Sequence, residues 1–370
     1  MTRVIHVQKV SGISGSEAHL LSLLPRLRAR GFDASIVVLH EGEAGAGEFV
    51  ERMREAGVPT DAWRMRFDLD PRVPVRLLTR RPDILHTHLV HADVLALPAA
   101  AAARVPVRIS TKHGFNEFRA NRLIARADRI VARFAHAQIA ISAGLADYLA
   151  VTEGFDRDAF TVVHYGIEPG APPSVPPDEP RLVAVGRLIP IKGLDVLLAA
   201  FAQARREVPE LSLELAGAGP LEPELRKAAP DGVTFLGRVS PVATVYERNA
   251  ILVVPSRGEG FGMVALEAAE RGRTAIVSAV GGLPEVVADG ETGLVVPAGD
   301  ADALAAAIVG LARDVDRVRE FGAAARQRAL TSFSADRNAD GIADLYRRLL
   351  SARSSTADAR RTSRKSNGTR

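Results

Sequence analysis

The sequence predicts an α/β protein with two doubly wound domains, each built on a parallel sheet, that face a central ligand cleft. Short apolar runs typical of buried parallel strands alternate with amphipathic helical patterns along the whole chain. A length of 370 residues suits two domains of ordinary size. Six of the 22 prolines fall within residues 168–180, a density that interrupts both sheets and helices and therefore predicts a linker.

These features divide the chain into five predicted segments. One parallel-sheet domain occupies residues 1–167, the linker follows it, and a second parallel-sheet domain occupies residues 181–335. A helix over residues 336–352 has no strand of its own and is expected to pack back toward the N-terminal domain. Residues 353–370 are rich in Ser, Thr and Arg and are predicted to form a basic tail without regular structure.

The hydrophobic pattern places the individual elements. In the first domain it predicts strands at residues 4–10, 34–39, 84–88, 108–112, 138–141 and 161–163, and helices at residues 19–30, 48–56 and 119–135. In the second domain it predicts strands at residues 181–185, 212–216, 234–236, 251–254, 274–278 and 293–296, and helices at residues 194–206, 221–228, 244–249, 262–271, 301–314 and 318–329.

The composition describes a globular protein that can form a core, with 47% hydrophobic and 25% charged residues. The chain has no cysteine and its first residues enter a strand without an apolar leader, so we expect a cytoplasmic protein without disulfides. The longest apolar stretch, residues 94–103, contains Pro98. It has half of the about 20 residues that a membrane-spanning helix needs.

The positive charge is concentrated at the C-terminal end. Residues 353–370 carry six basic side chains and one acidic side chain, which leaves the rest of the chain near −1 out of a total of +4. With few aromatic residues and no zinc-ligand spacing, this distribution argues against nucleic-acid binding by the folded body. The tail is expected to be solvated, with contact to an anionic lipid surface or to a nucleic acid as the alternative.

The segment Glu259–Glu267 carries the strongest functional signal. A glycine turn lies here between a short apolar strand and an apolar helix, which places free backbone N–H groups and a positive helix end at the carboxyl edge of the sheet. Glu259 and Glu267 should lie roughly 12 Å apart along this helix. A glycosidase pair needs about 5–9 Å between its carboxyl groups. The two glutamates are therefore predicted to bind separate parts of a long ligand, around a pyrophosphate.

Further glycine turns follow other predicted strands of the second domain. Residues 186–193 deliver Arg187 and Lys192 beside a helix start, and an Arg fork with a mobile Lys charge suits a diphosphate. Gly217 follows another strand and can let a ribose or a base approach the backbone. Residues 281–285 form a glycine turn into a short helix. No complete GxGxxG follows the first strand, which argues against a nicotinamide nucleotide.

Taken in order, Arg187 with Lys192 and Gly193, the Glu-x7-Glu segment, and the turn Gly281-Gly282-Leu283-Pro284-Glu285 resemble the family-4 (GT4-type) retaining glycosyltransferases, which have the GT-B fold. The resemblance covers residues 1–350. It implies that Arg187 and Lys192 hold the diphosphate of a nucleotide sugar, that Glu259 contacts hydroxyls of the transferred sugar, and that Glu267 contacts the ribose. It also implies a donor site completed by Gly15, Gly217, Arg238, Val239, Gly260, Phe261, Gly262, Met263 and Val264.

In the first domain, residues 14–17 resemble the glycine loop of the same family, although Ser14 stands where the family usually has the first of two glycines. The resemblance places Ser16 and Glu17 on the acceptor side. His113, at the end of a strand, matches the histidine that the family places beside the anomeric centre, and Arg187, Lys192 and Glu259 would act with it in catalysis. The alternative for His113 is a histidine that only caps its strand.

Three more histidines lie close together in the sequence at residues 86, 88 and 91, and alternate strand residues share a face. They allow a metal site as one interpretation, but we expect none, because Arg, Lys and a helix end can neutralise the phosphates of a GT-B donor. His88 is instead expected to line the acceptor side. A stripe of arginines along the predicted helix 119–135 suits either solvent or an anionic membrane surface.

The resemblance implies metal-independent sugar transfer, with retention, from a UDP- or GDP-type nucleotide sugar to a hydroxyl acceptor. It also implies that the nucleotide sugar is the donor substrate and that no further cofactor takes part. The setting would be the synthesis of bacterial glycans, glycolipids or glycosylated natural products. Two alternatives stay open: a nucleotide-sugar epimerase of the same fold, and a nucleotide-sugar binding protein without chemistry. The acceptor, the sugar, the base and the oligomeric state stay open as well.

Overall fold

The structure is a computed structural model that describes residues 1–115 and 122–366, with side chains for residues 1–115 and 125–353. Contacts divide the chain into two compact units. Unit 1 contains residues Met1–Ile141, Ala146–His164 and Ala335–Arg370. Unit 2 contains residues Ser142–Leu145 and Tyr165–Ser334.

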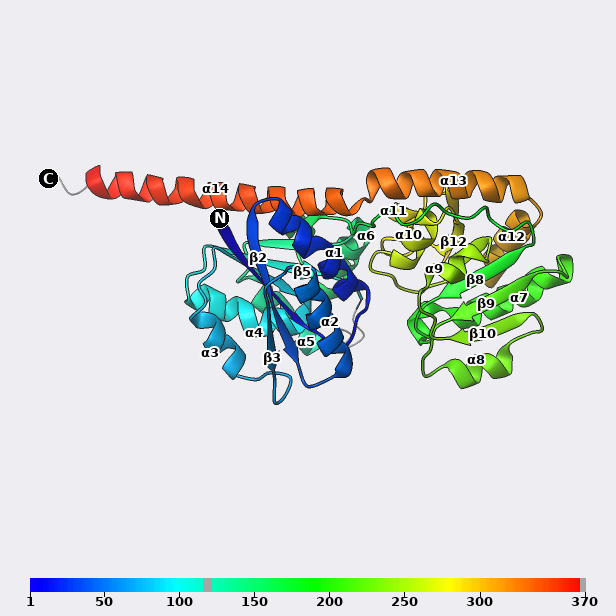
Figure 1. Ribbon diagram of the computed structural model, residues 1–370, viewed down its shortest axis with the longest axis horizontal. Helices are drawn as coiled ribbons and strands as arrows, with labels where there is room; N and C mark the ends of the chain where they lie inside the picture. The colour runs from blue at the N-terminus through cyan, green and yellow to red at the C-terminus, as the bar shows by residue number, and fades with distance from the viewer. Residues whose placement is uncertain (116–121, 367–370) are drawn as a thin grey trace. The chain divides into compact units, whose positions relative to one another are not determined.

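Unit 1 is built on a seven-stranded parallel sheet with the order β3-β2-β1-β4-β5-β6-β7. The connections run outward from β1 in both directions, as in doubly wound sheets. The strands are β1 (Thr2–Lys9), β2 (Phe32–His40), β3 (Thr60–Arg64), β4 (Ile84–His88), β5 (Val107–Lys112), β6 (Ala137–Ala140) and β7 (Phe160–Val162). The helices are α1 (Gly15–Ala29), α2 (Ala44–Glu55), α3 (Arg72–Leu78), α4 (Leu89–Ala102), α5 (Arg122–Ala132), α6 (Ala143–Glu153) and α14 (Ala335–Ser366) (Figure 1). The first three residues of α6, 143–145, belong to unit 2.

Both faces of this sheet are buried, because successive strand residues point to opposite sides. Val4 and Ile36 pack on one side in a cluster with residues of α1, α2 and α14. Ile5 and Val37, the neighbouring residues in the sequence, pack on the other side in a cluster with residues of α3 and α4. The alternation fixes the strand register and leaves the loops at the strand ends as the places for polar chemistry.

The sequence analysis did not predict four elements of unit 1, namely β3, α3, α4 and α6. The strand β3 has the sequence TDAWR, so it lacks the apolar run that marks the other strands. The helix α4 is apolar around most of its circumference and buries residues on several sides, so it lacks the amphipathic period that a helix prediction needs. The helix predicted at residues 119–135 appears as α5, and residues 119–121 lie outside the described part of the chain.

Unit 2 is built on a six-stranded parallel sheet with the order β10-β9-β8-β11-β12-β13, again doubly wound. The strands are β8 (Arg181–Val185), β9 (Ser212–Ala216), β10 (Val233–Gly237), β11 (Ile251–Val254), β12 (Thr274–Ser278) and β13 (Gly293–Val296). The helices are α7 (Leu194–Glu207), α8 (Glu222–Ala228), α9 (Ala243–Glu247), α10 (Met263–Glu270), α11 (Leu283–Val286), α12 (Ala301–Ala312) and α13 (Val315–Ser332). With the sheet of unit 1, this sheet confirms the predicted α/β class.

The C-terminal helix α14 belongs to unit 1 and packs against α1. Its residues Ile342 and Tyr346 are buried in the core, and Arg30 of unit 1 forms ion pairs with Asp336 at 2.9 Å and with Asp340 at 2.7 Å. The helix continues to Ser366, so its backbone is helical beyond residue 352, where the sequence analysis ended the helix and began an irregular tail. Within the described residues, no helix combines the length and apolar character that crossing a membrane requires.

Candidate functional site

The strand order of unit 2 reverses between β8 and β11, which are paired neighbours in the sheet. Doubly wound sheets bind ligands at the carboxyl ends of the strands beside such a reversal. The loop that follows β8 covers residues 186–193, and the loop that follows β11 covers residues 255–262. The motifs that the sequence analysis selected in unit 2 therefore lie at the topologically expected place.

The loop after β11 ends in Gly262, the N-cap residue of α10, whose φ of +105° lies in the left-handed region. A Cβ atom on Gly262 would lie 2.7 Å from Cδ2 of Leu283, so a side chain there would strain the backbone and force Leu283 to shift. Glycine also has no side chain that could accept hydrogen bonds from the first turn of α10. The N–H groups of Met263 and Val264 begin this helix, next to Gly260 and Phe261, and form a suitable anion site.

Lys192 and Glu259, which the sequence analysis assigned to neighbouring parts of one ligand, lie in contact. Lys192 Nζ donates to Glu259 Oε2 at 2.5 Å, and both side chains are largely buried. Their loops are also joined by backbone, since Arg257 N donates to Ile191 O at 2.8 Å. Arg187 is exposed on the same loop as Lys192, and no described residue forms a hydrogen bond or ion pair with its guanidinium group. The ammonium group of Lys192 is thus paired with a carboxylate, whereas the guanidinium group of Arg187 is exposed.

Glu267 lies on α10 and is partly buried. Burial raises the pKa of its carboxyl group, while the hydroxyl of Tyr246, which donates to Oε2 at 3.0 Å, opposes this shift. Burial and the neighbouring Glu267 carboxylate raise the pKa of Tyr246 well above its usual value. Tyr246 therefore acts as a neutral donor that orients Glu267, a contact that the sequence motif did not reveal.

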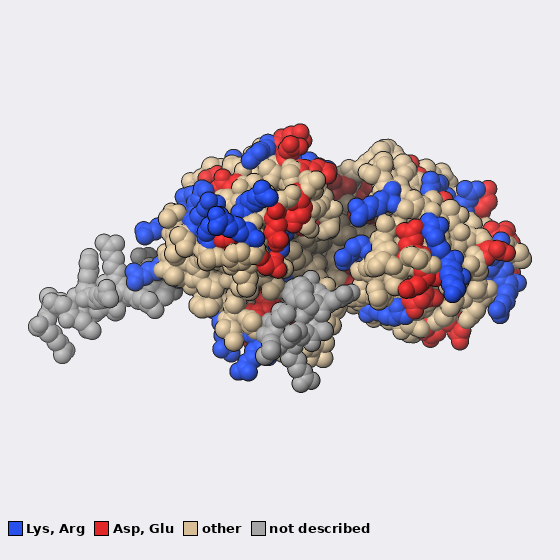
Figure 2. All heavy atoms as spheres, turned by 90° about the horizontal axis from the view of Figure 1, so that it is seen from below, with Lys and Arg blue, Asp and Glu red and all other residues tan. Residues whose placement is uncertain are grey.

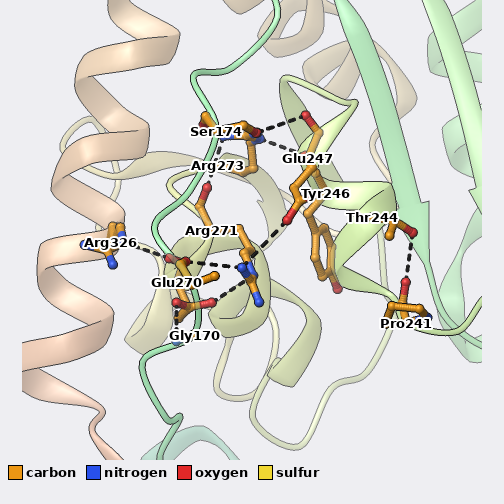
Figure 3. Close-up of polar contacts among 11 residues, drawn as sticks. Gly170, Ser174, Pro241, Thr244, Tyr246, Glu247, Glu270, Arg271, Arg273 and Arg326 are labelled. Carbon is orange, nitrogen blue, oxygen red and sulfur yellow. Dashed lines mark hydrogen bonds and ion pairs between the residues drawn. The ribbon is translucent and has the colours of Figure 1, made fainter.

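The backbone of Tyr246 is held by Arg273, which is 2% exposed. Arg273 Nε donates to the carbonyl oxygen of Tyr246 at 2.8 Å, and its two terminal nitrogens donate to Ser174, Glu247 and Arg271 (Figure 3). Ser174 belongs to the proline-rich segment that the sequence analysis called a linker. This segment is therefore tied to unit 2 by a buried guanidinium, and the same guanidinium positions the residue that contacts Glu267.

The glycine turn at residues 281–282 packs directly on the Glu259 loop. Gly282 N donates to Glu259 O at 3.3 Å, and a Cβ atom on Gly282 would lie 2.7 Å from Cα of Phe261. Glu285, at the end of the motif, accepts hydrogen bonds from the backbone N–H groups of Ala143 and Gly144, which belong to unit 2. The carboxylate of Glu285 thus has a structural role in the loop framework.

The remaining donor residues of unit 2 lie on the other side of β8. Gly217 follows β9 with a φ of +148°, and a Cβ atom there would lie 1.8 Å from the carbonyl oxygen of Gly186. This close approach brings the loop after β9 against the loop that carries Arg187. Arg238 and Val239 follow β10, one strand farther out, where Arg238 is exposed and Val239 is partly buried.

In unit 1, the loop after β1 leads into α1 through Ser14. Gly15 is the first residue of α1, and Ser16 Oγ accepts a hydrogen bond from Gln8 Nε2 at 3.2 Å. Glu17 is buried and forms a capping box, in which Ser14 N donates to Glu17 Oε2 at 3.0 Å, and Gln8 Nε2 donates to its other oxygen. Both oxygens of Glu17 therefore have partners within the protein, a helix-capping role that the sequence analysis missed.

His88 is the last residue of β4 and His113 directly follows the neighbouring strand β5, and the structure brings the two side chains together. His88 Nδ1 and His113 Nε2 are 2.9 Å apart. The third member of the expected histidine group, His91, lies instead beside Asp68, at 3.5 Å. Among the described residues, His6, His86 and His88 form the group of histidines whose ligand atoms lie close enough for a metal ion, within 4.8 Å of one another. His6 was not identified from sequence spacing.

A buried ion cluster fixes the end of β5, directly before His113. Lys112 Nζ donates to Asp93 Oδ2 at 2.7 Å and to Asp128 Oδ1 at 2.9 Å, and all three side chains are fully buried. Asp93 also accepts hydrogen bonds from the hydroxyls of Thr87 and Ser110. A fully buried lysine needs such partners because an unpaired charge would be costly. The cluster therefore anchors the strand end that presents His113.

The charges on the surface are mixed in sign. Figure 2 shows a face on which Lys and Arg side chains lie next to Asp and Glu side chains. Of the arginines in the predicted basic stripe, Arg119 lies outside the described residues and Arg126 is exposed on α5. Arg129 donates to the carbonyl oxygen of Gly154 at 3.1 Å, which is a contact within unit 1. Contact with a membrane surface stays a prediction.

Comparison with known proteins matches both halves of the chain to sugar-transfer families. Residues 13–170 match the family described as Glycosyltransferase Family 4, and residues 179–314 match the family described as Glycosyl transferases group 1. An alpha-maltose-1-phosphate synthase of Mycolicibacterium smegmatis is 34% identical over 60% of this chain, which spans 65% of that relative. A glycogen synthase of Mycobacterium tuberculosis is 31% identical over 72% of this chain and 69% of its own length.

A solved structure of the Anabaena protein HepE, in complex with UDP and glucose, has the same fold. It superposes with a TM-score of 0.80 at 20% identity and covers 93% of this chain and 99% of its own. The order of the motifs, the two doubly wound sheets and the matches to both family models all indicate the same protein family. The chain belongs to the GT4-type family of glycosyltransferases and has the GT-B fold.

Proposed function

We propose that the protein transfers a sugar from a UDP- or GDP-type nucleotide sugar to a hydroxyl acceptor, with retention at the anomeric carbon and without a metal ion. The observation that carries this proposal is the grouping of Lys192, Glu259 and the N-terminus of α10 beside Arg187. Such a group offers two cations and backbone N–H donors to a diphosphate and a carboxylate to the sugar attached to it.

The leaving diphosphate gains negative charge as the glycosidic bond breaks. Arg187, Lys192 and the first turn of α10 stabilise this charge more strongly in the transition state than in the bound donor, and such differential stabilisation accelerates transfer. In the structure, Lys192 is paired with Glu259. Binding of the donor replaces this pair with two separate contacts, between Lys192 and phosphate and between Glu259 and sugar hydroxyls.

The other end of the donor is bound by Glu267 and the base pocket. Glu267, oriented by the hydroxyl of Tyr246, accepts hydrogen bonds from the ribose hydroxyls. The base lies near Arg238 and Val239, and Gly217 allows the backbone to approach the nucleoside. In unit 1, Gly15 lies near the donor phosphate, Ser16, Glu17 and His88 lie on the acceptor side, and His113 lies beside the anomeric centre. An oxygen of the departing phosphate accepts the proton of the acceptor hydroxyl.

The test is release of nucleoside diphosphate from a panel of UDP and GDP sugars, with and without a panel of hydroxyl acceptors. Acceptor-dependent release, together with a glycoside that keeps the donor's anomeric configuration, supports the proposal. Formation of a new nucleotide sugar without acceptor would identify an epimerase instead. Tight donor binding without turnover on any acceptor would identify a binding protein. Either result overturns the proposal.

Two variants test the diphosphate site itself. Each charged hydrogen bond is worth about 1.5–3 kcal/mol, so Arg187→Ala and Lys192→Ala should each lower turnover by about 10- to 150-fold. Arg206→Ala and Lys227→Ala remove exposed cations from α7 and α8 and serve as matched controls. Equal activity of the site variants and their controls would show that the diphosphate lies elsewhere.

A further inference from the structure

A continuous hydrogen-bond chain crosses the interior of unit 1 from His113 to the C-terminal helix. His113 Nε2 lies 2.9 Å from His88 Nδ1, and His88 Nε2 lies 2.9 Å from His6 Nδ1. His6 Nε2 lies 3.3 Å from the hydroxyl of Tyr346, which lies 2.6 Å from His86 Nδ1. The residues come from β4, β1, α14 and the position directly after β5, so only the folded unit assembles this chain.

The histidines of the chain are neutral. Burial lowers the pKa of His6 to about 3, and burial also lowers the pKa values of His86, His88 and His113 well below the usual value. A neutral imidazole has one nitrogen that donates and one that accepts. Each link therefore fixes the next, and the whole chain has only two arrangements, with every proton on Nε2 or every proton on Nδ1.

The two distances at Tyr346 distinguish these arrangements. A hydroxyl has one proton to donate, and donation from O–H gives shorter contacts than donation from N–H. The 2.6 Å contact is therefore assigned to Tyr346 O–H donating to His86 Nδ1, and the 3.3 Å contact to His6 Nε2–H donating to the Tyr346 oxygen. His86 then carries its proton on Nε2, where Thr111 Oγ1 accepts it at 2.7 Å.

The same direction continues to His113. Because His6 donates through Nε2, its Nδ1 accepts from Nε2–H of His88. Because His88 donates through Nε2, its Nδ1 accepts from Nε2–H of His113. We propose that Tyr346 is a positioning residue that holds His113 in the Nε2–H tautomer, through His6 and His88, and so places the lone pair of the His113 ring on Nδ1.

A metal ion at His6, His86 and His88 is the competing explanation for this histidine group. A metal would take a lone pair from each of the three imidazoles. In the structure, however, His6 and His88 share one proton across 2.9 Å, and His86 is bonded on both sides, to Tyr346 and Thr111. The nitrogens of His6, His86 and His88 are thus already arranged as donors and acceptors, and the hydrogen-bond chain needs no ion.

The experiment is ¹⁵N NMR of histidine side chains in the full-length protein, because the ¹⁵N shifts of Nδ1 and Nε2 report the tautomer of each ring. The wild-type protein should show the Nε2–H tautomer for His6, His86, His88 and His113. An Nδ1–H tautomer at His113 in the wild-type protein overturns the proposal without any variant. Stoichiometric zinc in the purified protein, with shifts of metal-bound imidazole for the histidine group, overturns it as well.

Tyr346→Phe tests the causal link. The ring packs edge-on against Phe32 with centroids 5.3 Å apart, and phenylalanine retains that contact while it removes the hydroxyl. The proposal expects His113 to lose the pure Nε2–H signature in this variant. Tyr148→Phe makes the same change on α6 in the same unit, outside the hydrogen-bond chain, and should leave the His113 signals unchanged. An unchanged His113 spectrum in folded Tyr346→Phe overturns the proposal.

The catalytic consequence rests on the proposed function. Because one neutral hydrogen bond is lost, Tyr346→Phe should lower kcat by about two- to tenfold and leave the KM for the donor unchanged. A tautomer change without any sugar transfer by the wild-type protein would overturn the proposed function and leave the role of Tyr346 intact. Sugar transfer by the wild-type protein, with an unaltered His113 tautomer in the variant, would overturn only the role of Tyr346.

Discussion

Replacing Lys112 by methionine removes the cation from between two fully buried carboxylates. In the wild-type protein, Lys112 Nζ lies 2.7 Å from Asp93 and 2.9 Å from Asp128, and none of the three side chains is exposed. Methionine retains much of the volume but leaves both carboxylates without their shared cation. Breaking a buried ion pair by removing one partner costs about 3–5 kcal/mol, and we expect Lys112→Met to lower the free energy of unfolding of unit 1 by this amount.

The single tryptophan of the chain makes this measurement specific to unit 1. Trp63 lies on β3 and is 7% exposed, so its fluorescence reports unfolding of that sheet. A protein with two units need not unfold in one step, and a probe located in unit 1 reports the unfolding of that unit without a contribution from unit 2. The free energy of unfolding falls by about 3 kcal/mol per molar of urea for a protein of this size, so the expected loss lowers the urea concentration at the unfolding midpoint by about 1–1.7 M.

Lys9→Met is the matched control. Lys9 also contacts two carboxylates, on Glu41 and Asp68, but these partners are exposed. Exposed ion pairs contribute about 0–1 kcal/mol, so this variant should move the midpoint by about 0.3 M or less. If Lys112→Met shifted the Trp63 transition no further than Lys9→Met, the buried cluster would not anchor β5 as argued.

Three further predictions concern the ligand site and acid stability. Gly262→Ala forces a Cβ atom to 2.7 Å from Leu283 at a φ of +105°, so it should weaken UDP or GDP binding in calorimetry, whereas Gly310→Ala, where a Cβ atom meets nothing within 4 Å, should not. Glu267→Gln removes a charged acceptor for ribose and should weaken the same binding by about tenfold or more; unchanged binding would reassign this residue. Burial lowers the pKa values of His6 and His19 to about 3. Between pH 6.5 and 3 the unfolded chain therefore binds more protons than the folded protein, and the free energy of unfolding decreases as the pH is lowered. At pH 5.5 these two residues alone should reduce the unfolding free energy by about 2–3 kcal/mol relative to pH 7, and a flat denaturation profile over that range would contradict their burial as neutral groups.

The sequence predicted the fold where each element carries a local signal. The six strands of unit 2 are short apolar runs between turn residues, and all of them were located. The edge strand β3 and the uniformly apolar helix α4 lack the periodicity that distinguishes their type, so they were missed. The helical backbone of α14 beyond residue 352 was missed because its polar composition resembles that of an irregular tail.

The candidate site was likewise only partly predictable from the sequence. Arg187, Lys192 and Glu259 were predicted to be neighbours because each follows the carboxyl end of a parallel strand, and the structure places their loops together. The contacts that orient these motifs join residues far apart in the sequence and carry no motif. Tyr346 lies 260 residues from His86, and Arg273 reaches a proline-rich segment 99 residues before it. Only three-dimensional packing reveals such partners.

The position of α14 in unit 1 has a consequence for synthesis on the ribosome. Ile342 and Tyr346 fill the same core as Phe32 and Phe49, so β1 and β2 must wait for the synthesis of α14 before that core can close. Unit 2 is translated completely in the meantime and can fold first. Until α14 emerges from the ribosome, the apolar residues of β1 and β2 that belong to this core are open to water and to chaperones.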